Sequence, residues 1–275
     1  MLIIDTILIL CYIIIVNIID IRNIDSREKI NQFAASVYNW FIKECINHNQ
    51  YMEFTESQIN TLIKLYKTLI QKLREIPPQS INMHIEKTVK IHRNKLLKIL
   101  QEIFSDQKEI GQKKLCSEYS YELQKQILRL ELNTLLEPIL DIGCGKEAFF
   151  VKECMFSKKE VFGIDLYKIQ ESNNIFCKNW LEYDYKRKTW GSIVSHMAFS
   201  NHFNYHIANR TKYYTHYNEK YIEIINCLKI GGSFYYSPSL PKIEQNIDKR
   251  KYELNYFDNI VNENNIRSVR IKRIA

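Results

Sequence analysis

Glycine and proline are scarce in this sequence, with seven and five residues among 275. From Ser26 to about Asp106 there is no glycine, and the only prolines in that span are Pro77 and Pro78. Both residue types interrupt helices, so the span predicts a helical region with one break. Six of the seven glycines follow residue 140, which indicates a second region of different architecture.

Paired cysteine motifs and dense basic stripes are also missing. The seven cysteines are scattered and odd in number, and no two form a C-x-x-C pair. This pattern predicts reduced, mostly buried thiols and favours a cytoplasmic protein. The net charge is +8, but neither half of the chain has a basic stripe interleaved with aromatic residues. Nucleic acid is therefore disfavoured as a partner, though not excluded.

The first 25 residues are expected to form a separate apolar segment. Met1–Ile19 is strongly apolar, with an unbroken run from Ile7 to Val16, but Asp5 and Asn17 interrupt its two ends. A helix that spans a bilayer needs about 20 apolar residues, and runs of about 10–14 more often have another role. No signal-peptide cleavage pattern is evident. Two interpretations stay open: a segment packed on protein or an overextended start, and an anchor that associates residues 1–19 with a membrane.

Three apolar stripes at helical spacing predict three helices in the region 26–110. The stripes begin near Ile30, Ile59 and Ile81, and the proline pair separates the last two. Each stripe needs a partner surface, so we expect a small helical bundle. This bundle would be a structural appendage, a lid over a ligand pocket or a surface for homodimer formation.

The stretch Pro138–Gly145, with the sequence PILDIGCG, organises the rest of the chain. A short apolar segment leads into Gly143 and Gly145, and an apolar pattern of helical period follows. This order predicts a strand, a tight turn and a helix, a unit that offers backbone N–H groups to a ligand. With Asp165 further on, it also satisfies the loose dinucleotide fingerprint. However, Asp141 would repel a pyrophosphate and attract a cationic ligand that carries an amino acid ammonium.

The sequence Leu-Asp-Ile-Gly-Cys-Gly at residues 140–145 resembles motif I of the class I S-adenosylmethionine-dependent methyltransferases. A helix that closes on Leu-Lys-Ile-Gly-Gly before a strand is a second recurrent feature of that family, and residues 228–232 supply it in the expected order. The resemblance covers residues 117–275. It implies a Rossmann-like α/β domain with a seven-stranded, mostly parallel sheet whose last strand is antiparallel.

The resemblance also implies S-adenosyl-L-methionine as the cofactor. Asp141 and the glycine backbone would hold the methionine portion, and Asp165 would accept hydrogen bonds from the ribose. Asp184, or alternatively Glu182, would meet the adenine amino group. The full set of implied cofactor-binding residues is Asp141, Gly143, Cys144, Gly145, Asp165, Leu166, Asp184 and Ser195.

Histidines gather where the fourth expected strand ends, in the stretch 196–206. Together with Asn201 and several aromatic residues, they suit a proton acceptor and an aromatic wall for a methyl acceptor. His202 is the first candidate for the catalytic base, helped by His196 or Asn201, and structural histidines are the competing interpretation. A metal at His202 and His206 is disfavoured, because no carboxylate or cysteine pattern completes such a site.

We therefore predict methyl transfer from S-adenosylmethionine to a methyl acceptor of unknown class, with a small molecule favoured. No Asn/Asp-Pro-Pro-aromatic motif and no Pro-Cys nucleophile follows the fourth expected strand. Both absences make nucleic acid a less favoured acceptor, without excluding RNA. A protein side chain also fits as the acceptor. Two other functions stay open: a noncatalytic module that binds a partner through its helical region, and NAD-dependent redox chemistry.

Overall fold

The computed structural model describes residues 26–48, 51, 54–104, 119–166, 173–261 and 264–275. The chain divides into two compact units, Met1–Leu115 and Cys116–Ala275. The apolar segment 1–25, with its expected membrane association, lies outside the described residues. None of the helices in the described ranges is long and apolar enough to cross a bilayer.

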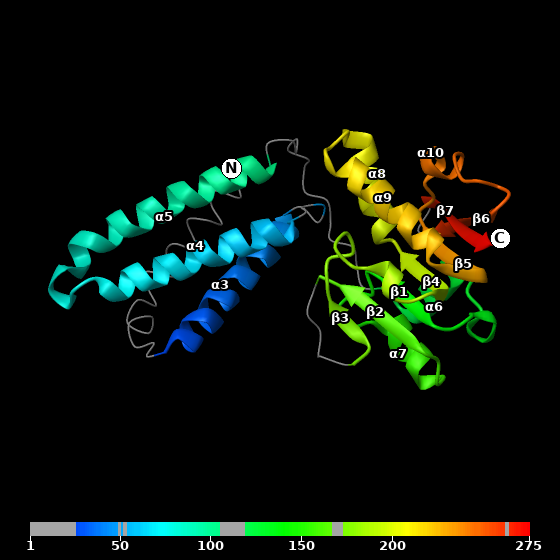
Figure 1. Cartoon of the computed structure of the whole chain (residues 1–275), viewed down its shortest axis with the longest axis horizontal. Coiled ribbons are helices and arrows are strands. Elements are labelled where there is room, and N and C mark those ends of the chain that lie inside the picture. The colour runs from blue at the N-terminus through cyan, green and yellow to red at the C-terminus, as the bar shows by residue number, and fades with distance from the viewer. Residues whose placement is uncertain (1–25, 49–50, 52–53, 105–118, 167–172, 262–263) are drawn as a thin grey trace. The chain divides into compact units, whose positions relative to one another are not determined.

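The first unit consists of three long helices, α3 (Arg27–His48), α4 (Glu56–Glu75) and α5 (Ile81–Phe104), with a short 3-10 helix η1 (Pro78–Ser80) before the last. α4 packs against both α3 and α5 (Figure 1). The apolar stripes meet in one core, which includes Phe41, Leu62, Tyr66, Leu73 and Leu96. The helical region predicted from the missing glycines is thus confirmed.

A capping box fixes the start of α4. The Thr55 hydroxyl accepts a hydrogen bond from the Gln58 backbone N–H (3.3 Å), and the Gln58 side chain accepts one from the Thr55 N–H (2.8 Å). These bonds satisfy N–H groups that have no acceptor within the helix. We expect Thr55→Ala to lower the free energy of unfolding of the helical unit by about 1 kcal/mol, measured by urea denaturation with circular dichroism.

Thr61→Ala is the matched control for this prediction. The Thr61 hydroxyl donates only to the Ser57 carbonyl one turn earlier (2.9 Å). Such a bond within a helix competes with the backbone ladder, so its removal should be neutral or slightly stabilising. Equal losses in the two variants would contradict the capping role of Thr55.

The second unit is built on a seven-stranded sheet with the order β3-β2-β1-β4-β5-β7-β6. The strands β1 to β5 pair in parallel, whereas β7 is antiparallel to both of its neighbours. The predicted Rossmann-like sheet with an antiparallel last strand is therefore confirmed. The strands are β1 (Ile139–Ile142), β2 (Val161–Asp165), β3 (Ile175–Cys177), β4 (Trp190–His196), β5 (Leu228–Ser237), β6 (Tyr252–Val261) and β7 (Asn264–Arg273).

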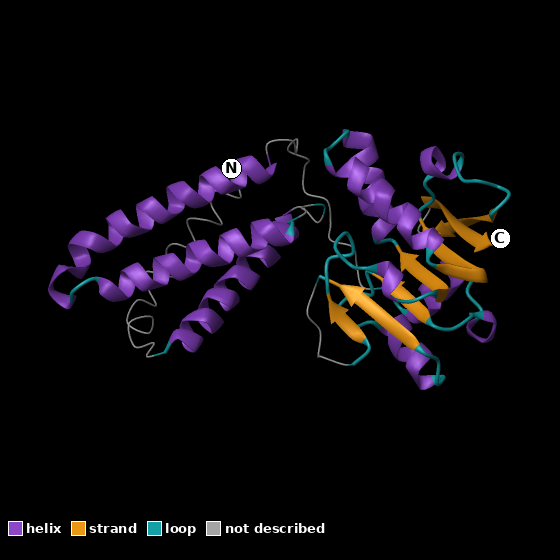
Figure 2. Cartoon of the chain, viewed as in Figure 1, coloured by secondary structure: helices purple, strands orange, loops and turns teal. Residues whose placement is uncertain are grey.

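Helices cover both faces of this sheet (Figure 2). The helical elements are α6 (Tyr121–Leu128), η2 (Leu132–Thr134), α7 (Phe149–Phe156), η3 (Tyr185–Arg187), α8 (Phe199–Asn209), α9 (Tyr213–Asn226) and α10 (Pro241–Glu244). Successive side chains of a strand point to opposite faces. In β1, Leu140 and Ile142 therefore join the core with α8 and α9, whereas Ile139 joins the core with α6 and α7. The same alternation places Asp141 on the face of α6 and α7.

The glycine pair at residues 231–232 has a different place from the one predicted. The resemblance predicts a helix that closes on residues 228–232, but α9 ends at Asn226 and both glycines lie within β5. Gly231 has a φ of +84°, and the pairing of β4 with β5 shifts register nearby, between Trp190 and Ser192. The glycine thus accommodates an irregularity in the sheet and does not terminate a helix.

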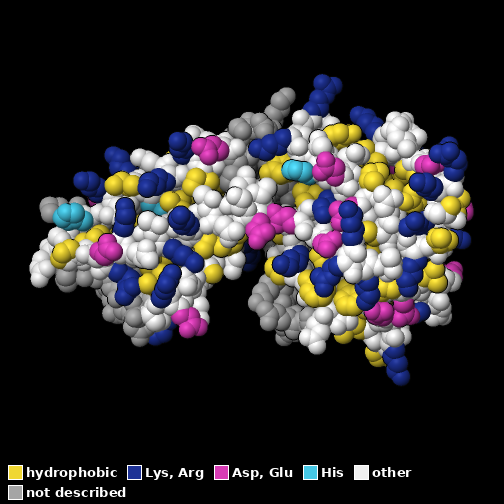
Figure 3. Space-filling view, in the orientation of Figure 1, with side chains coloured by type: hydrophobic (Ala, Val, Ile, Leu, Met, Phe, Trp, Pro, Cys, Tyr) yellow, Lys and Arg dark blue, Asp and Glu magenta, His cyan; other side chains and the backbone are white. Residues whose placement is uncertain are grey.

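Charged side chains on the face shown in Figure 3 are of both signs. Lys and Arg (dark blue) are interspersed with Asp and Glu (magenta) and with hydrophobic side chains (yellow). Over the described residues of this face the basic side chains form no continuous stripe. The picture agrees with the sequence, in which no dense basic stripe is present.

Candidate functional site

The turn after β1 is bonded to the end of β2. The N–H groups of Gly143 and Cys144 both donate to the Ile164 carbonyl, at 2.8 and 3.2 Å, and the Gly145 N–H donates to Asp165 Oδ2 at 2.9 Å. The φ angles of the two glycines are +75° and +74°, a region that other residues rarely adopt. The sequence predicted that this turn offers N–H groups to a ligand. These three N–H groups donate to β2 in the structure, and their contacts with a ligand stay predictions.

Gly143 also marks where three segments meet. A Cβ at this position would lie 2.4 Å from Ala198 Cβ and 3.2 Å from the ring of Trp180. The turn after β1 is therefore in close contact with the residue before α8 and with the loop after β3. All three follow the carboxyl ends of strands, and this is the edge at which open α/β sheets bind their ligands.

Asp141 carries a carboxyl group that no described residue satisfies. The residue is 2% exposed, and its Oδ2 has no hydrogen-bond partner among the residues that the structure describes. Burial raises the pKa of Asp141 to about 8, and the charge of Asp165 acts in the same direction. Such a buried polar atom costs free energy unless something pairs with it. A ligand that supplies a cation or a hydrogen-bond donor would account for this group.

Asp165 shapes the same turn from the end of β2. It is buried, and the bond from Gly145 fixes its carboxylate against the turn. The next residue, Leu166, accepts a hydrogen bond from the Cys177 thiol (3.2 Å) at the end of β3. The structure thus brings Asp141 and Asp165 together beside the glycine turn, as the sequence predicted, while their contacts with a cofactor stay predictions.

Asp184, the residue predicted to meet the adenine, caps the 3-10 helix η3, and its contact with the adenine stays a prediction. It is exposed, seven residues after the last residue of β3, and its carboxylate accepts a hydrogen bond from the Lys186 N–H (3.1 Å) as the cap of η3. Asn179, only two residues after β3, is buried, and its Oδ1 accepts from the Leu181 N–H (2.8 Å). We missed Asn179 because we searched for an acid. Its position next to the strand end was the signal available.

Ser195 and Cys144 both have structural partners. The Ser195 hydroxyl donates to the Ile142 carbonyl (2.9 Å) and accepts from the Phe199 N–H (3.2 Å), which ties β1 to the start of α8. The Cys144 thiol lies against Gly163, where a Cβ would come within 2.9 Å of its sulfur. Their side chains therefore contribute to the frame of the site, and cofactor contacts from either residue stay predictions.

His196 is the last residue of β4. Val194, two residues earlier in β4, pairs in register with Asp141 of β1. Side chains alternate between the two faces of a sheet, so His196 and Asp141 lie on the same face. Both ring nitrogens are buried without a hydrogen-bond partner among the described residues, and Tyr119 contacts the ring edge-on at 4.8 Å. Burial lowers the pKa of His196 to about 4, so its ring is neutral near pH 7.

His202 and His206 are packed within the α8 side of the domain. The His202 ring meets Trp180 edge-on at 4.9 Å. His206 Nδ1 lies 2.7 Å from Thr211 Oγ1, and its ring stacks on Tyr217 at 4.9 Å. These are contacts typical of structural histidines. No group of three His, Cys, Asp or Glu residues within the described ranges could hold a metal ion.

Asn201 is the third residue that the sequence proposed for catalysis. Its side-chain amide donates to the Met197 carbonyl at 3.3 Å, in the turn between β4 and α8. Met197 itself has a φ of +52°, so this bond supports an uncommon backbone conformation. The contact makes Asn201 a support for the turn, and a role for it in catalysis stays a prediction.

The strand order separates two folds that share a glycine-rich turn. The dinucleotide-binding fold has the parallel order 3-2-1-4-5-6. In this chain the antiparallel β7 is inserted between β5 and β6. It is the sheet that the resemblance to class I methyltransferases implies.

No protein-family model matches the sequence, and no curated protein matches it. Among solved structures, an rRNA methylase from Streptococcus thermophilus is 12% identical with a TM-score of 0.40, over 58% of this chain and 100% of that chain. The N-methyltransferase NodS from Bradyrhizobium japonicum, in complex with S-adenosyl-L-homocysteine, is 14% identical with a TM-score of 0.41, over 56% and 87%. The plantazolicin methyltransferase BpumL, in complex with the same compound, is 12% identical with a TM-score of 0.38, over 55% and 82%.

Proposed function

We propose that this chain binds S-adenosylmethionine and transfers its methyl group to an acceptor. The observation that carries the proposal is the buried, partnerless carboxyl of Asp141 beside the glycine turn. S-adenosylmethionine has an ammonium group and a sulfonium, both positive, which suit a carboxylate. A dinucleotide needs N–H donors for its pyrophosphate, and those of Gly143, Cys144 and Gly145 are already bonded within the protein.

The remaining parts of the cofactor are assigned along the sheet edge. Asp165 would accept hydrogen bonds from the ribose hydroxyls, because it ends β2 next to the turn. The adenine would lie at the loop after β3, where Trp180 is close to the turn, the buried Asn179 precedes it and Asp184 follows.

The chemistry asks little of the side chains. The bound cofactor supplies a methyl group that is already activated by its positive sulfur. The protein has to align the acceptor with that carbon and exclude water. We assign the acceptor contact to His196, because its two unpaired ring nitrogens can hydrogen-bond to an acceptor or take its proton. We keep a small molecule as the favoured acceptor class, with RNA and protein as alternatives.

The cellular location and the oligomeric state of the protein are also proposals. Three buried cysteines, Cys45, Cys154 and Cys227, are free thiols, which supports a cytoplasmic site of action. A homodimer formed through the helical unit stays a prediction, which analytical ultracentrifugation of the full chain would test.

Two measurements test the proposed function in order. Isothermal titration calorimetry should show binding of S-adenosylmethionine and S-adenosylhomocysteine, and none of NAD. Incubation with a radiolabelled methyl donor and fractionated cell extract should then move label into one class of molecule. Cofactor binding without transfer in any extract would favour the noncatalytic module, and no binding by a folded preparation would end the methyltransferase proposal.

We expect the two histidines at the site to respond differently to replacement. His196→Ala should lower label transfer about 100-fold and leave S-adenosylhomocysteine affinity nearly unchanged, because it removes only the acceptor contact. His202→Ala should instead lower the melting temperature, because the ring packs on Trp180. The reverse result, full transfer by His196→Ala and loss of transfer by a stable His202→Ala, would restore His202 as the catalytic candidate.

A further inference from the structure

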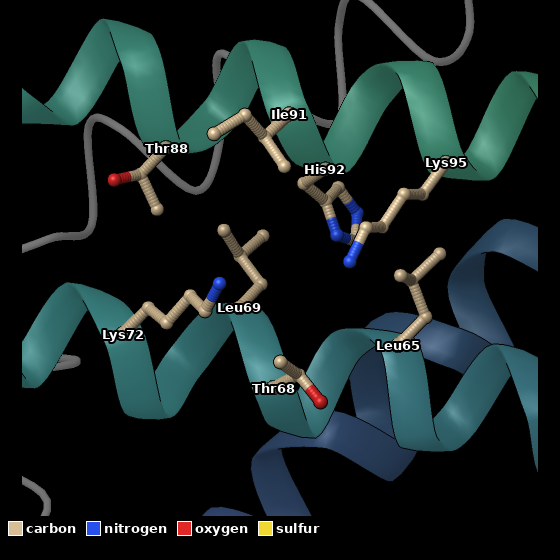
Figure 4. Close-up of a pocket in the computed structure, with 8 residues that line it drawn as sticks. All are labelled: Leu65, Thr68, Leu69, Lys72, Thr88, Ile91, His92 and Lys95. Carbon is tan, nitrogen blue, oxygen red and sulfur yellow. The ribbon is translucent and has the colours of Figure 1, made fainter.

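A groove between α4 and α5 combines an apolar floor with positive charge (Figure 4). Leu65 and Leu69 of α4 and Ile91 of α5 form the floor, and Ile91 is 43% exposed. Lys72 and Lys95 line the same groove from the two helices. Neither lysine forms an ion pair with a carboxylate within the described part of the chain. The groove therefore presents two uncompensated cations beside an apolar surface.

His92 adds a buried polar group to this groove. It is 4% exposed, its ring contacts Tyr66 at 5.0 Å, and in Figure 4 it points from α5 toward α4 beside Lys95. Its Nδ1 is buried without a hydrogen-bond partner among the described residues. Burial, assisted by the charge of Lys95, lowers the pKa of His92 to about 4, so the ring is neutral at pH 7. A neutral imidazole carries one N–H, which can donate to an anion in the groove.

We propose that this groove binds a small amphiphilic anion, namely a carboxylate on a short aliphatic chain. The carboxylate would lie by Lys72, Lys95 and the imidazole of His92, and the aliphatic chain would cover Leu69 and Ile91. Exposed lysines alone hold an anion weakly, because both charges stay solvated. The buried imidazole and the apolar floor are what make this groove selective, since a ligand site combines apolar lining with a few placed polar groups.

This ligand site lies wholly within the helical unit and does not depend on methyl transfer. It gives that unit a binding role of its own. A free phosphate would satisfy only the cations, and an aliphatic alcohol would satisfy only the floor. Comparing these two compounds with the amphiphilic anion therefore distinguishes a combined site from a purely charged or a purely apolar surface.

The test is a titration of the full chain, labelled with nitrogen-15 in its histidine rings, with octanoate at neutral pH. We expect a saturable shift of the His92 ring resonances, identified with His92→Gln, and a dissociation constant below about 1 mM. Octanol and inorganic phosphate should each bind at least about tenfold more weakly. The proposal would be overturned if octanol or phosphate bound as tightly as octanoate, or if octanoate caused no shift of the His92 resonances.

A matched pair of double variants locates the charge. Lys72→Met with Lys95→Met should weaken octanoate binding about tenfold or more. Lys87→Met with Lys90→Met is the control, since both are exposed lysines of α5 that do not line the groove. Circular dichroism checks that both proteins keep their helices. Equal weakening in the two double variants would mean that net charge, and not this groove, attracts the anion, and would also overturn the proposal.

Discussion

Replacing Asp141 with asparagine is expected to weaken cofactor binding severely and at the same time to stabilise the ligand-free protein. Asparagine keeps the size of the side chain but cannot become an anion. The cationic part of S-adenosylmethionine would then enter a buried site without its counter-charge. Loss of one partner of a buried charge pair is severe, so we expect the affinity for S-adenosylmethionine in calorimetry to fall at least about 100-fold.

The stabilising effect of this substitution follows from the pKa of Asp141. Burial, together with the charge of Asp165, raises it from 3.8 to about 8 in the folded protein. The contribution of this group to stability is therefore complete below pH 3.8 and is lost as the pH rises through about 8, because the unfolded chain ionises more easily. Asparagine has no proton to lose, and the interval between pH 3.8 and pH 7 corresponds to at most about 4 kcal/mol. A buried amide without partners offsets part of this gain, so we expect the free energy of unfolding at pH 7 to rise by roughly 2 to 4 kcal/mol, seen as a higher melting temperature.

Asp258→Asn is the matched control. This carboxylate is exposed on β6 and pairs with Arg267 at 2.8 Å. An exposed ion pair contributes little, so neither the melting temperature nor the affinity for S-adenosylmethionine should change much. If Asp141→Asn bound the cofactor as well as Asp258→Asn does, the carboxyl would not contact the ligand.

The helical unit illustrates how far local pattern reaches. A span without glycine and three stripes at helical spacing were enough to predict three helices, because helix formation and amphipathicity are local properties. The glycine pair at 231–232 shows the limit. A glycine after an apolar helix is the usual terminator, and only the pairing of β5 with β4 reveals that these glycines belong to a strand.

The site could be predicted in its composition but not in its hydrogen bonds. The motif indicated Asp141 and Asp165, and both lie at the glycine turn. The N–H groups of Gly143 and Cys144 donate to the carbonyl of Ile164, about 20 residues away in the chain. No local sequence pattern could reveal these hydrogen bonds. The ranking of His202 above His196 stays a prediction. The unpaired ring nitrogens of His196, which favour the opposite order, depend on tertiary packing and are not visible in the sequence.

The affinity for S-adenosylmethionine is expected to be highest near pH 8 and to fall on both sides. Below that pH, Asp141 is protonated in the free protein, because its pKa is raised to about 8, and it must lose the proton to pair with a cation. Above that pH, the α-amino group of the ligand, with an ordinary pKa of about 7.7–8.0, loses its charge. In a plot of affinity against pH, the acidic limb (below about pH 8) and the basic limb (above it) should therefore each approach a slope of about tenfold in affinity per pH unit.

Two neighbouring groups can be set aside as causes of the acidic limb. Burial lowers the pKa of His196 to about 4, so its ring stays neutral above about pH 5. The Cys154 thiol of α7 is buried, and burial together with the charge of Asp141 raises its pKa to about 12, so it stays protonated. Asp165 is the one other carboxylate that acts on the pKa of Asp141 within the described residues. The ionised carboxylate of Asp165 raises the pKa of Asp141, so Asp141 ionises more readily when a cation binds beside it.

Calorimetry between about pH 6 and pH 9 measures both limbs, and titrations in two buffers of different ionisation enthalpy count the protons. Near pH 7 binding should release about one proton, because the ligand selects the ionised form of Asp141. In Asp141→Asn the residual affinity should be level across the acidic limb. A level acidic limb in the unaltered protein would mean that Asp141 is already ionised without ligand or never meets it, and the charge selection on which the proposed function rests would be lost.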